Sequence, residues 1–353
     1  MARPAPAAAS DLRPAVEAAY PALAGGRWRR LSGGLVHATF EVEAPGGRYV
    51  VQRVHPVFDP IVHEDIEAVT AHLARRERPT FRLVRTGGGR LWTEVAGAPV
   101  RVLTHLAGCS VTRVADPGVA RSAGAALGRF HADLADLDHT FRSRRIAHDP
   151  PRHAAAMRAA VDGARGHRLY EAAAPLADAI ERAADRLPDV SGHPRRVVHG
   201  DPKIANLLFV PGEDDPPRPL AWVDLDTCGR QVLAYELGDA LRSWCNPAAE
   251  DAAEAGFDLA RFEAALAGYL AEAPPLSPDE AEGLVVGVEI VALELAARFC
   301  KDAVEESYFA WDAERFPASG EHQLARARAQ WALARAAADG RGARRRIVAK
   351  LLG

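Results

Sequence analysis

The sequence predicts an α+β protein with two lobes, a small N-terminal lobe rich in strands and a larger, mostly helical C-terminal lobe. Three observations favour this fold class. Apolar and polar residues alternate in short runs between Arg29 and Leu106, as they do in half-buried strands. From Ala115 onward the apolar residues recur at helical spacing. A chain of 353 residues is also long enough to form two such units.

The N-terminal lobe begins with a predicted β-hairpin. Residues 39–43 and 49–54 alternate as strands do, and the turn between them is supplied by 45–47. A helix is predicted over 63–76, because its apolar side chains recur every three or four positions. Two further short strands are expected, one at 81–85 and the other at either 90–95 or 100–104.

Apolar stripes with helical spacing predict the helices of the C-terminal lobe. They cover residues 120–137, 152–161, 169–187, 259–271, 280–303 and 324–338. One strand-rich stretch, 196–226, interrupts them with apolar strands at 207–210 and 220–223, joined by a turn rich in Pro and Asp. A cleft between two such lobes is the natural place for a small ligand.

These elements divide the chain into four expected segments. Residues 1–27 form an N-terminal segment that is helical or extended, and 28–106 form the N-lobe. Residues 107–340 form the C-lobe. The basic residues of 341–353 are expected to form a tail exposed to solvent, since nothing else in the chain suggests a partner for them.

Composition and charge exclude several classes of function. The 44 basic and 47 acidic residues give a net charge of −3, which provides no electrostatic footprint for nucleic acid. The four cysteines are scattered without a C-x-x-C pair, so they favour a reducing compartment over a disulfide framework or a zinc site. No membrane-spanning run or secretory signal is visible. We therefore expect a cytoplasmic protein that binds neither membranes nor nucleic acid, with its oligomeric state left open.

The most informative motif is H-x-D-x-K-x-x-N, which runs from His199 to Asn206 and follows an apolar strand. Phosphoryl transfer needs a carboxylate that orients the acceptor hydroxyl and takes its proton, and oxygen ligands that hold Mg²⁺. We assign Asp201 as the base, and Lys203 as the cation that neutralises the transferring phosphoryl group. His199 is expected to organise the loop from a buried position.

Two carboxylates follow the next apolar strand, in the sequence Asp224-Leu225-Asp226. We assign Asn206 and Asp224 as the metal ligands and Asp226 as a candidate ligand of a second metal. A similar His-x-Asp pair ends at Asp133 but lacks an Asn five residues later, so we interpret it as part of a helix surface.

The residues around this motif resemble the aminoglycoside-phosphotransferase-like family, a branch of the protein-kinase-like fold. The resemblance rests on residues 199–209, 222–227, 237–242 and 298–330, and it spans roughly 28–335. Within that family the chain looks most similar to the sugar kinases typified by N-acetylhexosamine 1-kinase. The resemblance implies an ATP-dependent kinase that uses Mg²⁺ and phosphorylates a sugar hydroxyl, with the anomeric position of a hexose or an N-acetylhexosamine as the expected target.

The resemblance also implies a nucleotide site in the N-lobe. Ser32, Gly33 and Gly34 occupy the place of the loop that covers the phosphates, where glycines allow a close backbone approach. No G-x-x-x-x-G-K-[ST] motif is present, which argues against a P-loop NTPase. Thr104 and Leu106 belong to the expected hinge, whose backbone would meet the adenine edge.

The strand at 49–54 should supply a lysine that grips the α- and β-phosphates, but the basic residue predicted to be in phase is Arg53. Arginine can bind phosphate with two hydrogen bonds, although it is not interchangeable with lysine. Its partner would be Glu64 or Glu67 of the next helix, and the resemblance favours Glu64. Donor preference, ATP or GTP, stays open.

For the acceptor, the resemblance carries over four residues that would bind sugar hydroxyl or carbonyl groups: His37, Asn246, Arg298 and Tyr308. Asp239 and Arg242 are interpreted as a structural ion pair, and residues 308–311 as either a stacking wall or core.

Two alternatives stay open. An aminoglycoside or amino-alcohol acceptor would need an acidic pocket, for which the late region offers Glu305, Glu306, Asp312 and Glu314. A catalytically silent nucleotide-binding regulatory module would explain Arg53 in place of lysine, but not the intact set of Asp201, Asn206 and Asp224.

Overall fold

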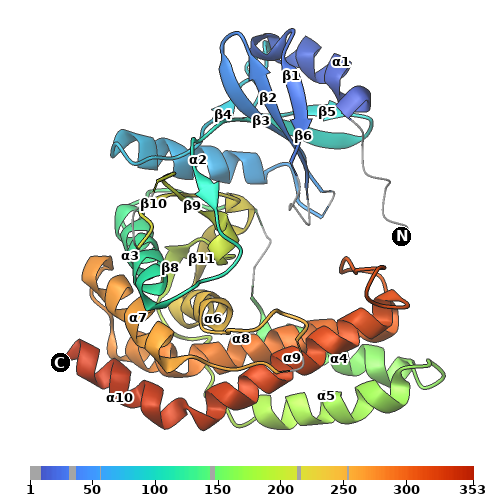
Figure 1. Ribbon diagram of the computed structural model, residues 1–353, viewed down its shortest axis with the longest axis vertical. Coiled ribbons are helices and arrows are strands. Elements are labelled where there is room, and N and C mark those ends of the chain that lie inside the picture. The colour runs from blue at the N-terminus through green and yellow to red at the C-terminus, as the bar shows by residue number, and fades with distance from the viewer. Residues whose placement is uncertain (1–8, 32–36, 56, 144–147, 213–215, 253) are drawn as a thin grey trace.

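An antiparallel sheet of six strands forms the N-lobe in the computed structural model, which describes residues 9–31, 37–55, 57–143, 148–212, 216–252 and 254–353 (Figure 1). The strands run β1-β2-β3-β6-β4 across the sheet, and β5 pairs with β6. Their bounds are β1 (Arg27–Arg30), β2 (Ala38–Ala44), β3 (Gly47–Arg53), β4 (Leu83–Val84), β5 (Thr93–Val95) and β6 (Ala98–Thr104). The predicted hairpin is therefore β2–β3, and both of the alternative later strands form.

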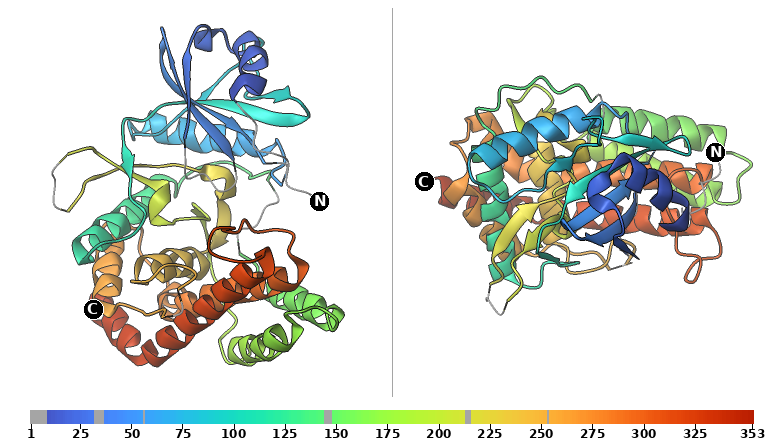
Figure 2. Two further views of the ribbon diagram at one scale, coloured as in Figure 1. Left: turned by 45° about the vertical axis from the view of Figure 1, so that its right-hand side comes forward. Right: turned by 90° about the horizontal axis from the view of Figure 1, so that it is seen from above.

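The two faces of this sheet have different neighbours. Val51 and Val102 are fully buried on one face, where they pack with Val16 of α1 (Ala9–Ala19). The opposite face presents Val50 and Leu103, which join the larger core that continues into the C-lobe. Figures 1 and 2 show α1 on the outer side of the sheet and α2 (Val62–Arg75) on the side of the C-lobe. Side chains of the second face therefore point toward the cleft.

The C-lobe consists of helices around two small antiparallel sheets, of order β10-β9-β7 and β11-β8. The strands are β7 (Cys109–Ser110), β8 (Arg195–Val198), β9 (Leu207–Phe209), β10 (Pro219–Trp222) and β11 (Gly229–Val232). The helices are α3 (Pro117–Asp133), α4 (Pro150–Gly163), α5 (Tyr170–Ala184), α6 (Leu233–Trp244), α7 (Leu259–Glu272), α8 (Pro278–Glu305), α9 (Ser319–Asp339) and α10 (Arg341–Leu352). All six helices expected from apolar stripes are present, close to their predicted bounds.

Helix α8 is the central element of this lobe. It starts at a capping box formed by Ser277 and Glu280, with Pro278 at its first position. Most of its side chains are buried, because α4, α5, α6 and α9 pack around it. None of the described helices is long and apolar enough to cross a membrane.

Both terminal segments pack more closely than expected. The N-terminal segment contains a helix, as expected, but α1 forms part of the N-lobe core and is not a separate unit. The C-terminal tail is not solvated either, because α10 packs on the C-lobe (Figure 1). Its Arg344 is fully buried, where it donates to the Val285 carbonyl at 3.0 Å and pairs with Glu289 of α8. Glu289 also accepts two hydrogen bonds from Arg341, at 2.9 and 2.6 Å. The buried carboxylate of Glu289 on α8 thus holds the basic C-terminal residues against the C-lobe.

Helices α6 and α8 approach each other closely at two glycines. A Cβ at Gly287 would lie 2.2 Å from the carbonyl oxygen of Ala234, and one at Gly238 would lie 2.4 Å from that of Gly287. A residue with a side chain cannot occupy either position without moving a helix. This contact fixes where α6 lies in the C-lobe.

We expect Gly287→Ala to destabilise the protein by about 1–3 kcal/mol, because overpacking outweighs the gain in helix propensity. Chemical denaturation of both proteins measures the difference. Gly163→Ala is the matched control, since a Cβ there would meet nothing within 4 Å, and it should not lower stability. Equal stability of Gly287→Ala and wild type would contradict the close packing.

Candidate active site

The loop that carries the H-x-D-x-K-x-x-N motif connects β8 to β9 and is held by a buried carboxylate. The backbone N–H groups of His199 and Gly200 donate to the two oxygens of Glu236 on α6, each at 2.9 Å. Glu236 is only 1% exposed, and His131 lies 3.4 Å from it. Burial acts to raise the pKa of Glu236, but the hydrogen bonds and His131 hold it below its usual value. A charged carboxylate therefore fixes the start of the loop.

His199 is buried, in agreement with the role expected for it. Its Nε2 donates to the carbonyl of Val223 at 2.9 Å, and its Nδ1 accepts from the backbone N–H of Asp201 at 3.3 Å. The ring packs edge-on against Trp222. Burial lowers its pKa, so the imidazole is neutral and joins the catalytic loop to the strand before Asp224.

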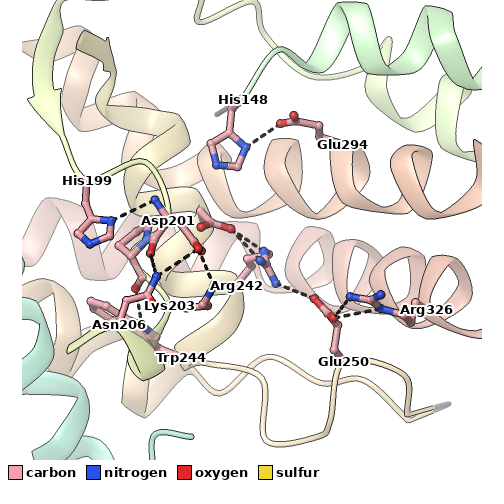
Figure 3. Close-up of polar contacts among 12 residues, drawn as sticks. His148, His199, Asp201, Lys203, Asn206, Arg242, Trp244, Glu250, Glu294 and Arg326 are labelled. Carbon is pink, nitrogen blue, oxygen red and sulfur yellow. Dashed lines mark hydrogen bonds and ion pairs between the residues drawn. The ribbon is translucent and has the colours of Figure 1, made fainter. Parts of the chain in front are cut away.

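Asp201, Lys203 and Asn206 form one hydrogen-bonded group (Figure 3). Lys203 Nζ donates to Asp201 Oδ2 at 2.6 Å, and Asn206 Nδ2 donates to the same oxygen at 3.1 Å. The Asp201 side chain stays 32% exposed. Burial works to raise the pKa of its carboxyl, but the Lys203 ammonium outweighs it and holds the pKa below its usual value. Asp201 is therefore an ionised carboxylate that a small molecule can reach.

Gly200 brings this loop against the segment that carries the two later aspartates. Its φ is +82°, and a Cβ there would lie 2.3 Å from the Thr227 carbonyl oxygen. The Thr227 hydroxyl donates to the His199 carbonyl at 3.1 Å. The backbone N–H of Val223 donates to the Asn206 carbonyl at 2.9 Å. These contacts bring Asn206 and Asp224 together.

The donor set at Asn206 and Asp224 fits Mg²⁺. The amide group of Asn206 donates to Asp201, which leaves its side-chain oxygen as an acceptor. Asp224 is in a left-handed conformation, with φ 63° and ψ 57°. Burial, followed by the charges of Asp226 and Asp201, raises the pKa of Asp224 to about 7. A cation would relieve this repulsion, and carboxylate and amide oxygens are the ligands that Mg²⁺ prefers.

Asp226 is placed differently from the prediction. Both of its oxygens accept hydrogen bonds from Arg101 of β6, at 2.7 and 2.6 Å. His37 Nε2 lies 3.4 Å away and carries the ring proton, because its Nδ1 accepts from the backbone N–H of His55 at 3.1 Å. His37, Asp224 and Asp226 have atoms within 4.8 Å of one another, but a protonated nitrogen is no metal ligand. Asp226 is thus held by a buried guanidinium, which disfavours the second metal expected there.

The predicted pair of Arg53 and Glu64 is also wrong. Arg53 lies in register with Val100 and on the face of Val51, both of which are buried on the α1 side of the sheet. Glu64 pairs with Arg142 instead. An error of one position in a strand turns a side chain to the opposite face.

Of the other residues expected to bind the nucleotide, two lie where the lobes join and three are outside the described part of the chain. Ser32, Gly33 and Gly34 lie outside the described residues. Thr104 ends β6 and is bonded to Arg82 through both its backbone N–H and its hydroxyl, each at 2.9 Å. Leu106 follows and packs against the large core. The two residues thus form the predicted link between the lobes.

The four expected acceptor residues do not form one set. His37 belongs to the N-lobe and faces Asp226. The side-chain oxygen of Asn246 accepts from the backbone N–H groups of Ala248 and Gly256, so it organises its own loop. Arg298 and Tyr308 both contact Phe309 and lie together. Of the four residues, only Arg298 and Tyr308 are grouped as predicted.

Three residues of the site were missed. Glu236 and Trp244 hold the catalytic loop from α6, the second by donating to the Pro202 carbonyl at 3.1 Å (Figure 3). Arg101 holds Asp226. Two of them had a signal, since Glu236 is a carboxylate in an apolar helical stripe and Arg101 is a cation in an apolar strand.

The comparisons with known proteins agree with this geometry. The sequence matches the phosphotransferase enzyme family, APH, over residues 27–274. An amicoumacin kinase solved with AMP-PNP and Ca²⁺ is similar in structure at 16% identity, with a TM-score of 0.62 over 92% of this chain and 93% of that chain.

Two further solved structures are similar. A microcompartment-associated aminopropanol kinase has 18% identity and a TM-score of 0.62, over 95% of this chain and 99% of that one. A choline/ethanolamine kinase family protein from Mesorhizobium loti has 17% identity and a TM-score of 0.57, over 98% and 99%. At these identities the structures support the two-lobe α+β fold. With the family match over most of its length, the chain belongs to the phosphotransferase enzyme family, APH.

Proposed function

We propose that this protein is an ATP-dependent kinase that transfers the γ-phosphoryl group to a hydroxyl of a small molecule. The observation that carries this proposal is the hydrogen-bonded group of Asp201, Lys203 and Asn206, held beside Asp224 by backbone contacts. Family membership supports the reaction class. The intact group speaks against a silent regulatory module.

Asp201 acts as the base. Oδ2 accepts from Lys203 and Asn206, which leaves Oδ1 of the exposed carboxylate for the acceptor hydroxyl. The hydroxyl oxygen attacks the γ-phosphorus, the bond to the β-phosphate oxygen breaks, ADP leaves and the proton passes to Asp201. Lys203 offsets negative charge beside the transferring group. Mg²⁺, when bound at Asn206 and Asp224, supplies charge neutralisation of the phosphates.

The charges on the C-lobe wall beside Asp201 favour an acceptor without net positive charge. Figure 3 shows Arg242 between Asp201 and Glu250, with Arg326 beyond. Arg242 also bonds Asp239 at 2.8 Å, the structural ion pair expected from the sequence. Asp239 and Glu250, two carboxylates of this wall, are thus paired with arginines.

Arg298 continues the same wall. Its guanidinium carbon lies 5.6 Å from the centre of the Phe309 ring, which Arg326 also contacts at 5.2 Å. Among the residues that the structure describes, no hydrogen-bond or ion-pair partner is found for Arg298. An arginine in this state can donate to hydroxyl or carbonyl oxygens of an acceptor, which supports a sugar as the proposed substrate.

A hydroxyl compound that carries an amine is the second candidate, and the relatives favour it. The similar structures include kinases named for aminopropanol and for choline/ethanolamine. Two of the acids expected to receive an amine are engaged elsewhere, since Glu305 pairs with Lys301 and Glu306 pairs with Arg168. The amine of such an acceptor would therefore have to bind other groups of the C-lobe wall.

Asp201→Asn should lower turnover by about 10²–10⁴-fold, because an amide cannot take the proton. Binding of Mg-ATP, followed by calorimetry, should be largely unchanged. Asp133→Asn is the matched control, because it alters the other His-x-Asp carboxylate, which pairs with Arg78 at 2.8 Å. Near wild-type turnover of Asp201→Asn would refute the assignment of the base.

Asn206→Ala and Asp224→Ala should each shift the dependence of rate on Mg²⁺ to higher concentration. The effect of Asp224→Ala should be larger, because a charge is lost as well as a ligand. Rates measured over a Mg²⁺ titration check both variants. Unchanged titration curves in the two variants would show that the metal binds elsewhere.

Arg298→Ala should raise the KM for a sugar acceptor and lower kcat/KM by roughly 1–3 kcal/mol, while the KM for ATP stays constant. Arg328→Ala, at an exposed position of α9, is the control. If the acceptor is cationic, the same change should instead raise kcat/KM by removing repulsion. Steady-state kinetics with sugars and amino alcohols therefore separates the two candidates.

A further inference from the structure

The buried cation on the cleft face of the N-lobe sheet comes from β6, since Arg48 of β3 lies on the same face but is half-exposed and pairs with Glu41. Gln52 of β3 and Arg101 of β6 are in register and lie on the face of Val50 and Leu103. Arg101 Nε donates to Gln52 Oε1 at 2.8 Å. The residue next to Gln52, Arg53, lies on the opposite face. The strand that supplies the phosphate-gripping lysine of protein kinases thus supplies an amide here.

Helix α2 offers no free carboxylate to this cation. Glu64 pairs with Arg142, and Glu67 pairs with Arg82 and Arg85 at 3.1 Å. The buried carboxylate of Asp65 accepts from His139 and from the backbone N–H groups of 142 and 143. The strand-to-helix ion pair of protein kinases is therefore not formed by these groups.

Arg101 reaches across to the C-lobe instead. Its two terminal nitrogens bond both oxygens of Asp226, and the two side chains are 2% and 1% exposed. His37 Nε2 lies 3.4 Å from Asp226 as well. Asp226 lies in the 3-10 turn Leu225–Thr227, immediately after Asp224. The ion pair therefore fixes the turn on which the proposed metal ligand sits.

We propose that Arg101 is a positioning residue of the donor site, and that Asp226 is its counter-ion and not a metal ligand. The pair takes the place of the strand-to-helix pair by tying the N-lobe sheet directly to the turn beside Asp224. This inference rests on the proposed function, because it concerns the Mg²⁺-nucleotide site of that kinase.

The physical reason is the combination of burial and strain at this turn. Asp224 holds a left-handed conformation that persists only when its surroundings impose it. Without Arg101, the buried carboxylate of Asp226 would lie unpaired beside that of Asp224, and the two would repel each other. The turn would then move away from Asn206. Arg101 thus acts on metal binding without touching the metal.

The test measures binding, not turnover. The thermal shift caused by AMP-PNP, a non-hydrolysable ATP analogue, is followed over a Mg²⁺ titration for wild type, Arg101→Met, Asp226→Asn and the double variant. Each single change should raise the half-saturating Mg²⁺ concentration by about 10–100-fold. This is the typical loss of metal affinity when a residue that orients a metal ligand is removed. The double variant should be no worse than either single variant, because both remove one interaction.

Arg344→Met is the matched control, since it also breaks a buried arginine–carboxylate pair, that of Arg344 on α10 with Glu289. It should lower the melting temperature and leave the Mg²⁺ dependence unchanged. If Arg101→Met does not fold, Arg101→Lys keeps the charge and loses the two-point contact, and it should show a smaller shift in the same direction.

Three results would overturn the inference while the proposed function stands. They are an unchanged Mg²⁺ dependence in the Arg101 variant, additive effects in the double variant, or loss of Mg²⁺ dependence in Asp226→Asn alone. The last result would make Asp226 a ligand. A wild-type protein that shows no Mg²⁺-dependent shift with the analogue would overturn the proposed function itself, and this inference with it.

Discussion

The two hydrogen bonds from the catalytic loop to the buried carboxylate of Glu236 are the constraint on which the site depends. Helix α6 carries Glu236 near its start and Trp244 at its end, and each residue holds one part of the loop. The helix itself is fixed by its glycine contact with α8. The position of Asp201 is thus set by the deepest packing of the C-lobe and not by the loop's own sequence.

Three aspartates in one small region have different partners, and these partners separate their roles. Asp201 is balanced by Lys203, and Asp226 by Arg101. Burial and the charges of Asp226 and Asp201 raise the pKa of Asp224, so its environment favours a bound cation. In the proposed mechanism the same residue type therefore serves as base, counter-ion and metal ligand within one site.

The parts that could be predicted from the sequence are those that depend on local spacing. The motif predicts that Asp201, Asn206 and Asp224 lie together, and apolar periodicity predicts six of the C-lobe helices. The parts that failed depend on contacts between distant residues. Arg53 lies on the face opposite to the expected one, because the register of β3 with β6 cannot be read from the sequence of one strand. The basic C-terminal run is ordered by Glu289, which lies on another helix.

The central claim is that the chain forms a phosphate ester on a small molecule. Its most direct measurement is ³¹P NMR of the wild-type protein with Mg-ATP and a panel of N-acetylhexosamines, hexoses, aminoglycosides and amino alcohols. The account predicts that one class of compound yields a new phosphate ester resonance together with an equal amount of ADP. Intact ATP with every compound, or ADP with only inorganic phosphate, would contradict it.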